Sequence, residues 1–235
     1  MLRVEKLSAG YGELHILFDV DVEAPDQKIT TLVGANGSGK STLLKSVFGL
    51  ATIYSGTILL EDRDVTKIPP HKKARMKMAY LPQVENIFTN LTVQENLKIA
   101  GYALDEAQYQ DGFELALQTF PELKNLIGRR ARTLSGGERQ FLAVSTALVR
   151  KAQMLMLDEP TAQLSPRLSD TMFQKIATLR DKLGLGIILV EQDVRKALGI
   201  GDEAYALING AVAFHGKAHE LLEHEHFEKY CMGVC

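Results

Sequence analysis

Cysteine is scarce in this sequence, and the features it lacks narrow the possible classes of protein. Only Cys231 and Cys235 occur, both at the end of the 235-residue chain, which argues against a disulfide framework and suits a reducing cytoplasm. No apolar run approaches the roughly 18 residues of a membrane-spanning helix, and the first ten residues lack the apolar core of a signal peptide. We therefore expect any work at a membrane to depend on partners.

A surplus of charge is also missing. The formal net charge is -2, which gives no electrostatic reason to expect a nucleic-acid partner. The remaining composition is that of an ordinary globular protein, with 46% hydrophobic and 24% charged residues. At 235 residues the length falls between one and two domains, and the chain is long enough to bury a sizeable core. The specific information therefore lies in local motifs.

The strongest local pattern is G-A-N-G-S-G-K-S-T at residues 34–42, at a predicted turn between an apolar strand and a helix. The glycines of G-x-x-x-x-G-K-S let successive backbone amides point at phosphate oxygens, and the helix start adds its positive dipole end. Lys40 would place a mobile charge beside the β- and γ-phosphates, and Ser41 would offer a hydroxyl to Mg²⁺. The residues predicted here to bind nucleotide are Gly34, Asn36, Gly37, Ser38, Gly39, Lys40, Ser41 and Thr42.

Polar side chains follow two other predicted strands. Residues 154–157 are continuously apolar, as in a strand buried on both faces, and end in Asp158 and Glu159. Because neighbouring strand side chains point opposite ways, one carboxylate can reach the metal on the Ser41 hydroxyl, and the other can face an attacking water. Gln83 also follows a predicted strand, and open α/β sheets bind ligands at such carboxyl ends. With the phosphate loop, the acidic pair predicts a Mg²⁺–nucleotide site.

A second glycine-rich helix start follows a helical stretch. Residues 84–134 contain helical patterns and no strand pattern, which predicts a helical insertion. Ser135 and Glu138 then form an S-x-x-E capping box at the start of the next predicted helix. Capping does not explain Gly136 and Gly137, since each glycine costs about 1 kcal/mol relative to alanine. Exposed amides at such a helix start favour an anion, so we predict a second phosphate-binding surface here.

Other segments receive structural interpretations. Tyr11 lies between two glycines on a predicted turn, where its ring could stack on adenine or simply fill the turn. The basic run at residues 67–77 is typical of a solvated face, with docking to an acidic or lipid-adjacent partner surface as the alternative. Residues 216–235 predict an exposed, helical C-terminal tail. The remaining strand patterns cover residues 2–7, 16–22, 57–60, 77–81, 187–190, 204–208 and 211–214, and a long helical pattern covers 166–183.

Taken together and in order, these motifs resemble those of the ATP-binding cassette (ABC) ATPases, and the resemblance covers essentially the whole chain. Residues 134–140, L-S-G-G-E-R-Q, match the LSGGQ-type signature, which other phosphate-loop ATPases lack. The phosphate loop resembles Walker A, residues 154–159 resemble Walker B with its following glutamate, Gln83 resembles the Q-loop glutamine, and Tyr11 resembles the aromatic that stacks on adenine.

This resemblance implies the fold. We expect one α/β domain over residues 1–235, with the three-layer core of a P-loop NTPase and a mainly parallel sheet. An N-terminal antiparallel β subdomain, the inserted helical subdomain at 84–134 and the helical tail at 216–235 complete the expected architecture.

The resemblance also implies a mechanism. Two subunits would pair head to tail around two ATP molecules, each ATP touching the Walker motifs of one subunit and Ser135, Gly136 and Gly137 of the other. The residues implied to organise Mg²⁺ are Ser41, Gln83 and Asp158, while Lys40 and the loop amides hold the phosphates and Glu159 polarises the attacking water. The implied activity is hydrolysis of ATP.

Two positions depart from the family pattern. Gln192 stands where most members carry the histidine of the switch loop. Glutamine can donate a hydrogen bond to the γ-phosphate but cannot exchange a proton near neutral pH, so acid or base assistance rests on Glu159. Ser165 stands where an aspartate is common in the loop after Walker B, which leaves its contact with the other subunit open.

The E-Q-D sequence around Gln192, the compact length and the A-N-G-x-G-K opening are most similar to the ATPase subunits of branched-chain amino acid importers. That likeness implies integral membrane permeases and a second ABC ATPase subunit, identical or different, as partners, and a solute-binding protein outside the membrane as an indirect one. It places the chain at the cytoplasmic face of the membrane. The alternatives are the ATPase that extracts lipopolysaccharide, suggested by residues 80–83 and 87–88, and a soluble ABC ATPase of translation or iron–sulfur assembly.

Overall fold

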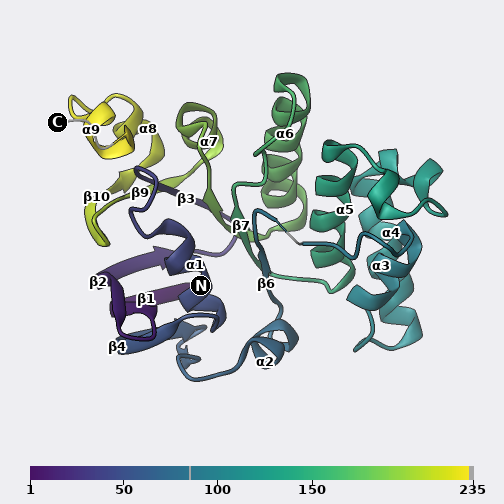
Figure 1. The fold of residues 1–235 in the computed structure, drawn as a ribbon, viewed down its shortest axis with the longest axis horizontal. Helices are drawn as coiled ribbons and strands as arrows, with labels where there is room; N and C mark the ends of the chain where they lie inside the picture. The colour runs from purple at the N-terminus through teal and green to yellow at the C-terminus, as the bar shows by residue number, and fades with distance from the viewer. Residues whose placement is uncertain (85, 233–235) are drawn as a thin grey trace.

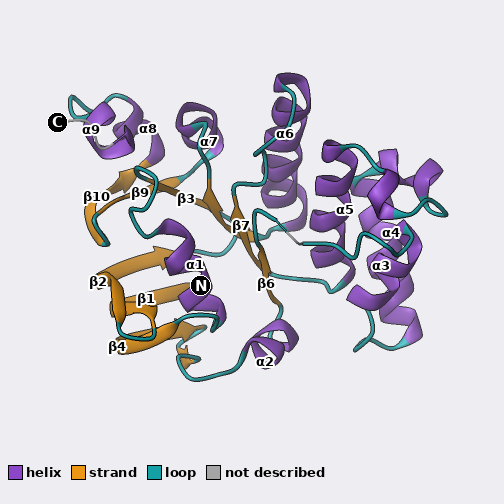
Figure 2. Cartoon of the chain, in the orientation of Figure 1, coloured by secondary structure: helices purple, strands orange, loops and turns teal. Residues whose placement is uncertain are grey.

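The computed structural model describes residues 1–84 and 86–232 of the chain, so Cys235 and the end of the predicted tail lie outside it. Its central sheet has the strand order β10-β9-β3-β8-β7-β6 (Figures 1 and 2). The strands from β9 to β6 run parallel, and β10 pairs with β9 as an antiparallel hairpin. These strands are β3 (Ile29–Val33), β6 (Met78–Leu81), β7 (Met154–Asp158), β8 (Gly186–Val190), β9 (Glu203–Ile208) and β10 (Ala211–Lys217).

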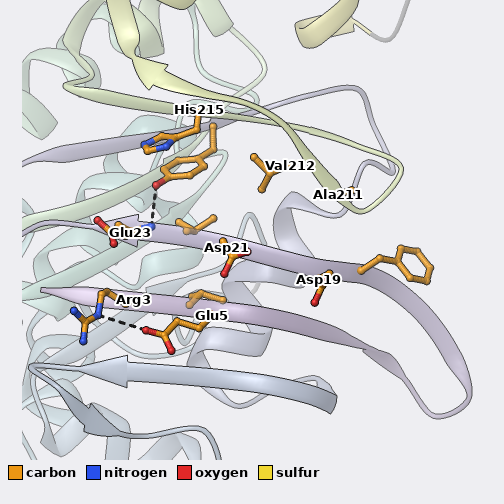
Figure 3. Close-up of a pocket in the computed structure, with 12 residues that line it drawn as sticks. Arg3, Glu5, Asp19, Asp21, Glu23, Ala211, Val212 and His215 are labelled. Carbon is orange, nitrogen blue, oxygen red and sulfur yellow. Dashed lines mark hydrogen bonds and ion pairs between the residues drawn. The ribbon is translucent and has the colours of Figure 1, made fainter.

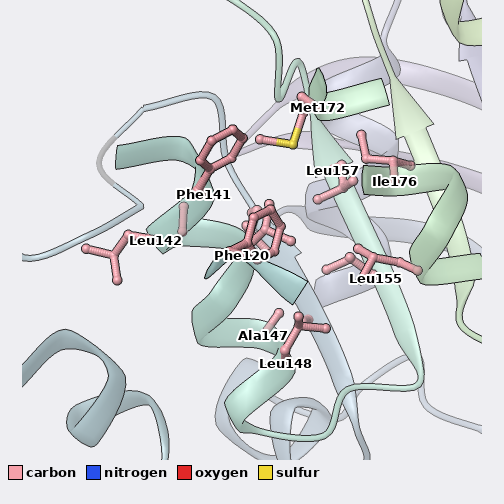
Figure 4. Close-up of a cluster of buried hydrophobic side chains, with 14 of the residues drawn as sticks. Phe120, Phe141, Leu142, Ala147, Leu148, Leu155, Leu157, Met172 and Ile176 are labelled. Atoms are coloured by element: carbon pink, nitrogen blue, oxygen red, sulfur yellow. The ribbon is translucent and has the colours of Figure 1, made fainter. Parts of the chain in front are cut away.

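The apolar run of β7 is buried because both faces of this sheet are covered. Leu155 and Leu157 belong to the core under the helices α5 and α6, whereas Met154 and Met156 belong to the core on the opposite face. This alternation explains why the run shows no polar periodicity. Figure 4 shows the α5–α6 side, where the Phe120 and Phe141 rings lie 5.3 Å apart between centroids.

A second, antiparallel sheet lies on the other face, in the order β2-β1-β4-β5. Helix α1 lies between the two sheets, since Leu43 and Leu44 share one core with Val20 of β2 and Ile188 of β8. This arrangement places the start of α1, and the loop before it, at the carboxyl ends of the parallel strands (Figure 1). The elements are β1 (Leu2–Tyr11), β2 (Leu14–Ala24), α1 (Lys40–Phe48), β4 (Thr52–Leu60) and β5 (Arg63–Asp64).

Helices fill the stretch between β6 and β7, where the sequence predicted helical structure followed by a capped helix. α3 begins with a capping box formed by Thr92 and Glu95, and α5 begins with the predicted box of Ser135 and Glu138. Both α3 and α4 pack beside α5 at the end of the molecule farthest from β10 (Figure 1). The elements are α2 (Pro70–Arg75), α3 (Val93–Ala100), α4 (Glu106–Thr119), η1 (Pro121–Leu126), η2 (Ala131–Thr133), α5 (Gly136–Val149), α6 (Pro166–Leu183) and α7 (Val194–Ile200).

Two interpretations of surface segments hold only in part. The other basic residues of the run at 67–77 are exposed, as a solvated face requires, and Lys73 is the exception. Lys73, inside the basic run, is fully buried, and its ammonium group donates a 2.7 Å hydrogen bond to the carbonyl oxygen of Val47 near the C-terminal end of α1. Burial lowers the pKa of Lys73 to about 8. Lys73 therefore satisfies a carbonyl at the negative end of the helix dipole, and it is not part of a solvated face.

The C-terminal segment also differs from the predicted exposed tail. Residue 216 still belongs to β10, and two short helices follow, α8 (Ala218–Leu222) and α9 (Phe227–Met232). Leu221, Phe227 and Cys231 are buried against β9 and α7 because these helices present an apolar side to the sheet. Among the described residues, no helix combines the length and the apolar character that a membrane crossing requires.

Candidate nucleotide-binding site

The loop between β3 and α1 has the backbone that its glycines permit. Gly34 has φ 144° and Gly39 has φ 106°, values that side chains disfavour. A Cβ atom would lie 2.3 Å from the Leu207 carbonyl oxygen at Gly34 and 2.7 Å from the Leu17 side chain at Gly39. The loop is held from outside by Gly210 in the β9–β10 turn, whose N–H donates to the Ser38 carbonyl oxygen at 3.0 Å.

Lys40 occupies the mouth of this loop. Lys40 is only 7% exposed, and its ammonium group donates to the carbonyl oxygens of Gly34 at 2.7 Å and Ala35 at 2.9 Å. Burial lowers the pKa of Lys40, while the charges of Glu159 and Asp158 oppose that shift. The buried hydroxyl of Ser38 has no hydrogen-bond partner among the described residues. A buried cation and an unsatisfied hydroxyl in a glycine-rich loop that leads into a helix fit a phosphate group.

Ser41 and Asp158 meet, as the sequence predicted for two groups that share a metal ion. The Ser41 hydroxyl donates to Asp158 Oδ1 at 2.9 Å, and the Tyr80 hydroxyl donates to Oδ2 at 3.1 Å. Burial, together with the charge of Asp158, raises the pKa of Tyr80. Sequence reasoning gave Tyr80 no role. Its position one strand away from Asp158 follows from the pairing of β6 with β7, which the motif alone does not show.

Glu159 accepts hydrogen bonds from the two glutamines of the predicted site. Its Oε2 atom accepts from Gln83 Nε2 at 2.6 Å and from Gln192 Nε2 at 2.7 Å. The carboxylates of Asp158 and Glu159 thus have different partners, as predicted, but the cause differs. Glu159 lies beyond the end of β7 with φ 52°, so a left-handed turn rather than strand pleating redirects it. Loops after β6, β7 and β8 converge on this one carboxylate.

Glu191 is a site residue to which the sequence pattern gave no role. It is 3% exposed; its Oε1 accepts from the Thr161 N–H at 2.7 Å, and its Oε2 accepts from the Gln192 N–H at 3.2 Å. Burial raises the pKa of Glu191 to about 7, against the hydrogen bonds that lower it. The only available signal was its place between a buried strand and Gln192.

Tyr11 and the glycine-rich start of α5 are placed differently from the loop residues. Tyr11 ends β1 instead of lying on a turn, is 40% exposed, and has the Lys45 ammonium 5.9 Å from its ring centroid. Gly136 is exposed, and a Cβ atom there would approach nothing described closer than 3.8 Å. The fold itself therefore gives no reason for glycine at position 136.

Cavities surround the phosphate loop. Three of them, of about 260, 250 and 180 Å³, are lined by loop residues together with Gln192, Glu159 and residues of α9. Within the described part of the chain, none of these three cavities is lined by Ser135, Gly136 or Gly137. A larger cavity of about 550 Å³ lies elsewhere, between the β1–β2 and β9–β10 hairpins (Figure 3). We assign the nucleotide to the loop because the converging charges and hydroxyls are there.

Known proteins resemble this chain along its whole length. A family model described as "ABC transporter" matches residues 17–162. The probable branched-chain amino acid transport ATP-binding protein LivF of Archaeoglobus fulgidus is 59% identical and covers 100% of this chain and 99% of its own. The high-affinity branched-chain amino acid transport ATP-binding protein BraG of Pseudomonas aeruginosa is 40% identical, covering 94% and 95%. The lipopolysaccharide export system ATP-binding protein LptB of Escherichia coli strain K12 is 30% identical, covering 99% and 97%.

Solved structures share the fold. A nucleotide-free ATP-binding cassette from an ABC transporter superposes with a TM-score of 0.87, at 24% identity over 98% of both chains. A dimeric bacterial ABC transporter cassette superposes with a TM-score of 0.82, at 20% identity over 93% of this chain and 99% of its own. These likenesses confirm the predicted architecture of an antiparallel N-terminal sheet and a mainly parallel core sheet.

Proposed function

Because the chain belongs to the ABC transporter family of ATP-binding proteins, we propose that it binds and hydrolyses ATP to power an importer of branched-chain amino acids. The identity of 59% with LivF over the full length, against 30% with LptB, favours amino-acid import over lipopolysaccharide export. The two relatives that are named as transport ATP-binding proteins, LivF and BraG, support a transporter over a soluble ABC ATPase of translation or iron–sulfur assembly.

The observation that carries the ATPase proposal is the convergence of charge at one edge of the sheet. Lys40 supplies a cation inside the phosphate loop, and Glu159 lies where the loops after β6, β7 and β8 meet. The Glu159 carboxylate orients the attacking water and receives its proton, because it is the carboxylate not engaged by Ser41. Gln83 and Gln192 hold that carboxylate in place through their side-chain amides.

Mg²⁺ fits the residues beside the loop. The Ser41 hydroxyl and the Asp158 carboxylate are already in contact, and both are the oxygen ligands that Mg²⁺ prefers. Gln83 donates through Nε2, which leaves its carbonyl oxygen as the ligand atom. When bound, the ion neutralises charge on the β- and γ-phosphates. The adenine would stack on the exposed ring of Tyr11.

The start of α5 completes the site of another subunit in this proposal. Gly136 is exposed and lines none of the cavities beside the loop of the same chain within the described residues. A helix start whose first turn has exposed amides binds an anion that approaches from outside. The second subunit is an ABC ATPase, identical or different, and permeases bind the pair at the cytoplasmic face of the membrane.

Affinity capture tests the transporter assignment. We expect the tagged chain, captured from detergent-solubilised membranes, to retain polytopic membrane subunits. The solute-binding protein is only an indirect partner of this chain in the proposal. The measurement is mass spectrometry of the captured subunits, with an untagged strain as the control. Recovery of ribosomes or iron–sulfur scaffold proteins in place of membrane subunits would refute the assignment.

A further inference from the structure

Glu191 ties two loops of the site together. Its Oε1 accepts from the Thr161 N–H at 2.7 Å and its Oε2 accepts from the Gln192 N–H at 3.2 Å. Thr161 belongs to the turn that begins at Glu159, a turn closed by the Ala162 N–H donating to the Glu159 carbonyl oxygen at 3.1 Å. Gln192 returns to the same residue, because its Nε2 donates to Glu159 Oε2 at 2.7 Å. The contacts thus form a closed ring through Glu159, Gln192, Glu191 and Thr161.

Burying an ionised carboxylate at position 191 costs free energy. Glu191 is 3% exposed, and its burial raises its pKa to about 7. The ionisable groups around it are Glu159, whose charge raises that pKa further, and Lys40 and Cys231, which line the same cavity of about 250 Å³. Since the ionised form is disfavoured by burial, the stability of the fold gives no reason to prefer it over a neutral isostere.

The ionised carboxylate does one thing that a neutral isostere cannot do. Each of its oxygens accepts from a backbone N–H, and those two N–H groups lie on different loops. A carboxamide or a protonated carboxyl group has one oxygen that accepts freely, while the other atom carries hydrogen. The contact at risk is the longer one, to the Gln192 N–H.

We propose that Glu191 is a positioning residue for ATP hydrolysis, which fixes the backbone of the switch loop so that Gln192 holds Glu159 in place. The inference rests on the proposed ATPase function. The position of Gln192 matters for turnover in this proposal, because glutamine cannot exchange a proton near neutral pH and acts only through its hydrogen bonds. Glu191 acts through Gln192 and Glu159 and does not itself touch the nucleotide in this account.

The test is Glu191→Gln, assayed by phosphate release in the chain with its captured partners. At pH 8 we expect kcat to fall at least about tenfold, in line with the loss of one positioning contact of about 1.4 kcal/mol, with the KM for ATP nearly unchanged. The melting temperature at pH 8 should not fall, because the change removes a buried charge. Glu114→Gln, an exposed position on α4, is the matched control and should leave all three values unchanged.

The pH profile separates positioning from a purely structural role. Below about pH 7 the wild-type carboxyl group becomes protonated, since the pKa of Glu191 is about 7, and it then resembles the carboxamide. The ratio of wild-type to Glu191→Gln kcat should therefore approach one as the pH falls from 8 to 6. A Glu191→Gln kcat equal to wild type at pH 8, a ratio independent of pH, or a loss of kcat accompanied by a lower melting temperature would overturn the inference. A wild-type chain without turnover would overturn the proposed function and this inference with it.

Discussion

Glu159→Gln is expected to lower ATP turnover by about 10²–10⁴, the range for loss of general acid–base assistance, while the protein keeps its ATP. Glu159 is the carboxylate that both Gln83 and Gln192 contact, and neither glutamine can itself accept a proton near neutral pH. Binding should persist because Lys40 and the loop amides are unchanged. The measurement is phosphate release at saturating ATP, together with the nucleotide retained after rapid desalting.

Glu114→Gln provides the control for Glu159→Gln, because it makes the same chemical change at an exposed position on α4. It should hydrolyse ATP like the wild type and retain no extra nucleotide. Wild-type turnover in Glu159→Gln would show that another group activates the water, and the role assigned to Glu159 would be wrong.

Gly136→Glu is expected to reduce turnover at least about 10²-fold, comparable to the loss of one preorganised donor at a reacting anion. Gly136 is exposed, and a Cβ atom there meets nothing described closer than 3.8 Å, so the new side chain does not begin with a clash in its own subunit. In the pair of subunits it would place a negative charge against the phosphates held by the other chain. Binding of ATP to the loop of the mutated chain should remain within twofold of the wild type, as measured by nucleotide titration.

Gly128→Glu is the matched control for Gly136→Glu. Gly128 is also exposed, and a Cβ atom there has nothing described within 4 Å. It should keep wild-type turnover, since it lies outside the start of α5. Equal losses in the two variants would mean that added charge on this surface impairs the protein in general, and the second phosphate-binding surface would lose its support.

The regular elements were predictable where the chain carries its own boundary signals. α6 begins at Pro166 after Ser165 and ends before Gly184, which adopts a left-handed conformation, so the predicted span 166–183 agrees with the structure. The buried strands β7 and β8 were recognisable as short apolar runs. β1 continues to Tyr11, farther than predicted, because pairing with β2 extends through that residue. Tertiary pairing overrides the local glycine signal there.

Burial of charged residues was not predictable in the same way. Lys73 lies in a basic run that resembles a solvated face, yet packing of α2 near the C-terminal end of α1 buries it against a free carbonyl. The charge pattern contains no information about that contact. Burial of Phe227 and Cys231 in the terminal segment depends likewise on the position of β9 and α7.

The residues of the site also fall into those that the sequence predicted and those that it did not. The sequence predicted that one carboxylate of the acidic pair lies within reach of the Ser41 hydroxyl, and the 2.9 Å contact between Ser41 and Asp158 agrees with this. It did not indicate Tyr80 or Glu191, because both enter through the lateral order of β6, β7 and β8. Motifs describe residues that contact the ligand, whereas residues that hold those groups in place appear only when the strands are assembled.

The measurement that tests the account most directly is steady-state phosphate release with Mg-ATP by Lys40→Ala beside Lys72→Ala. Both changes remove one lysine, but Lys40 lies inside the phosphate loop and Lys72 is exposed on α2. The account predicts background hydrolysis for Lys40→Ala and wild-type hydrolysis for Lys72→Ala, for the chain alone and with its captured partners. Wild-type turnover in Lys40→Ala would contradict the assignment of this loop as the site of ATP hydrolysis.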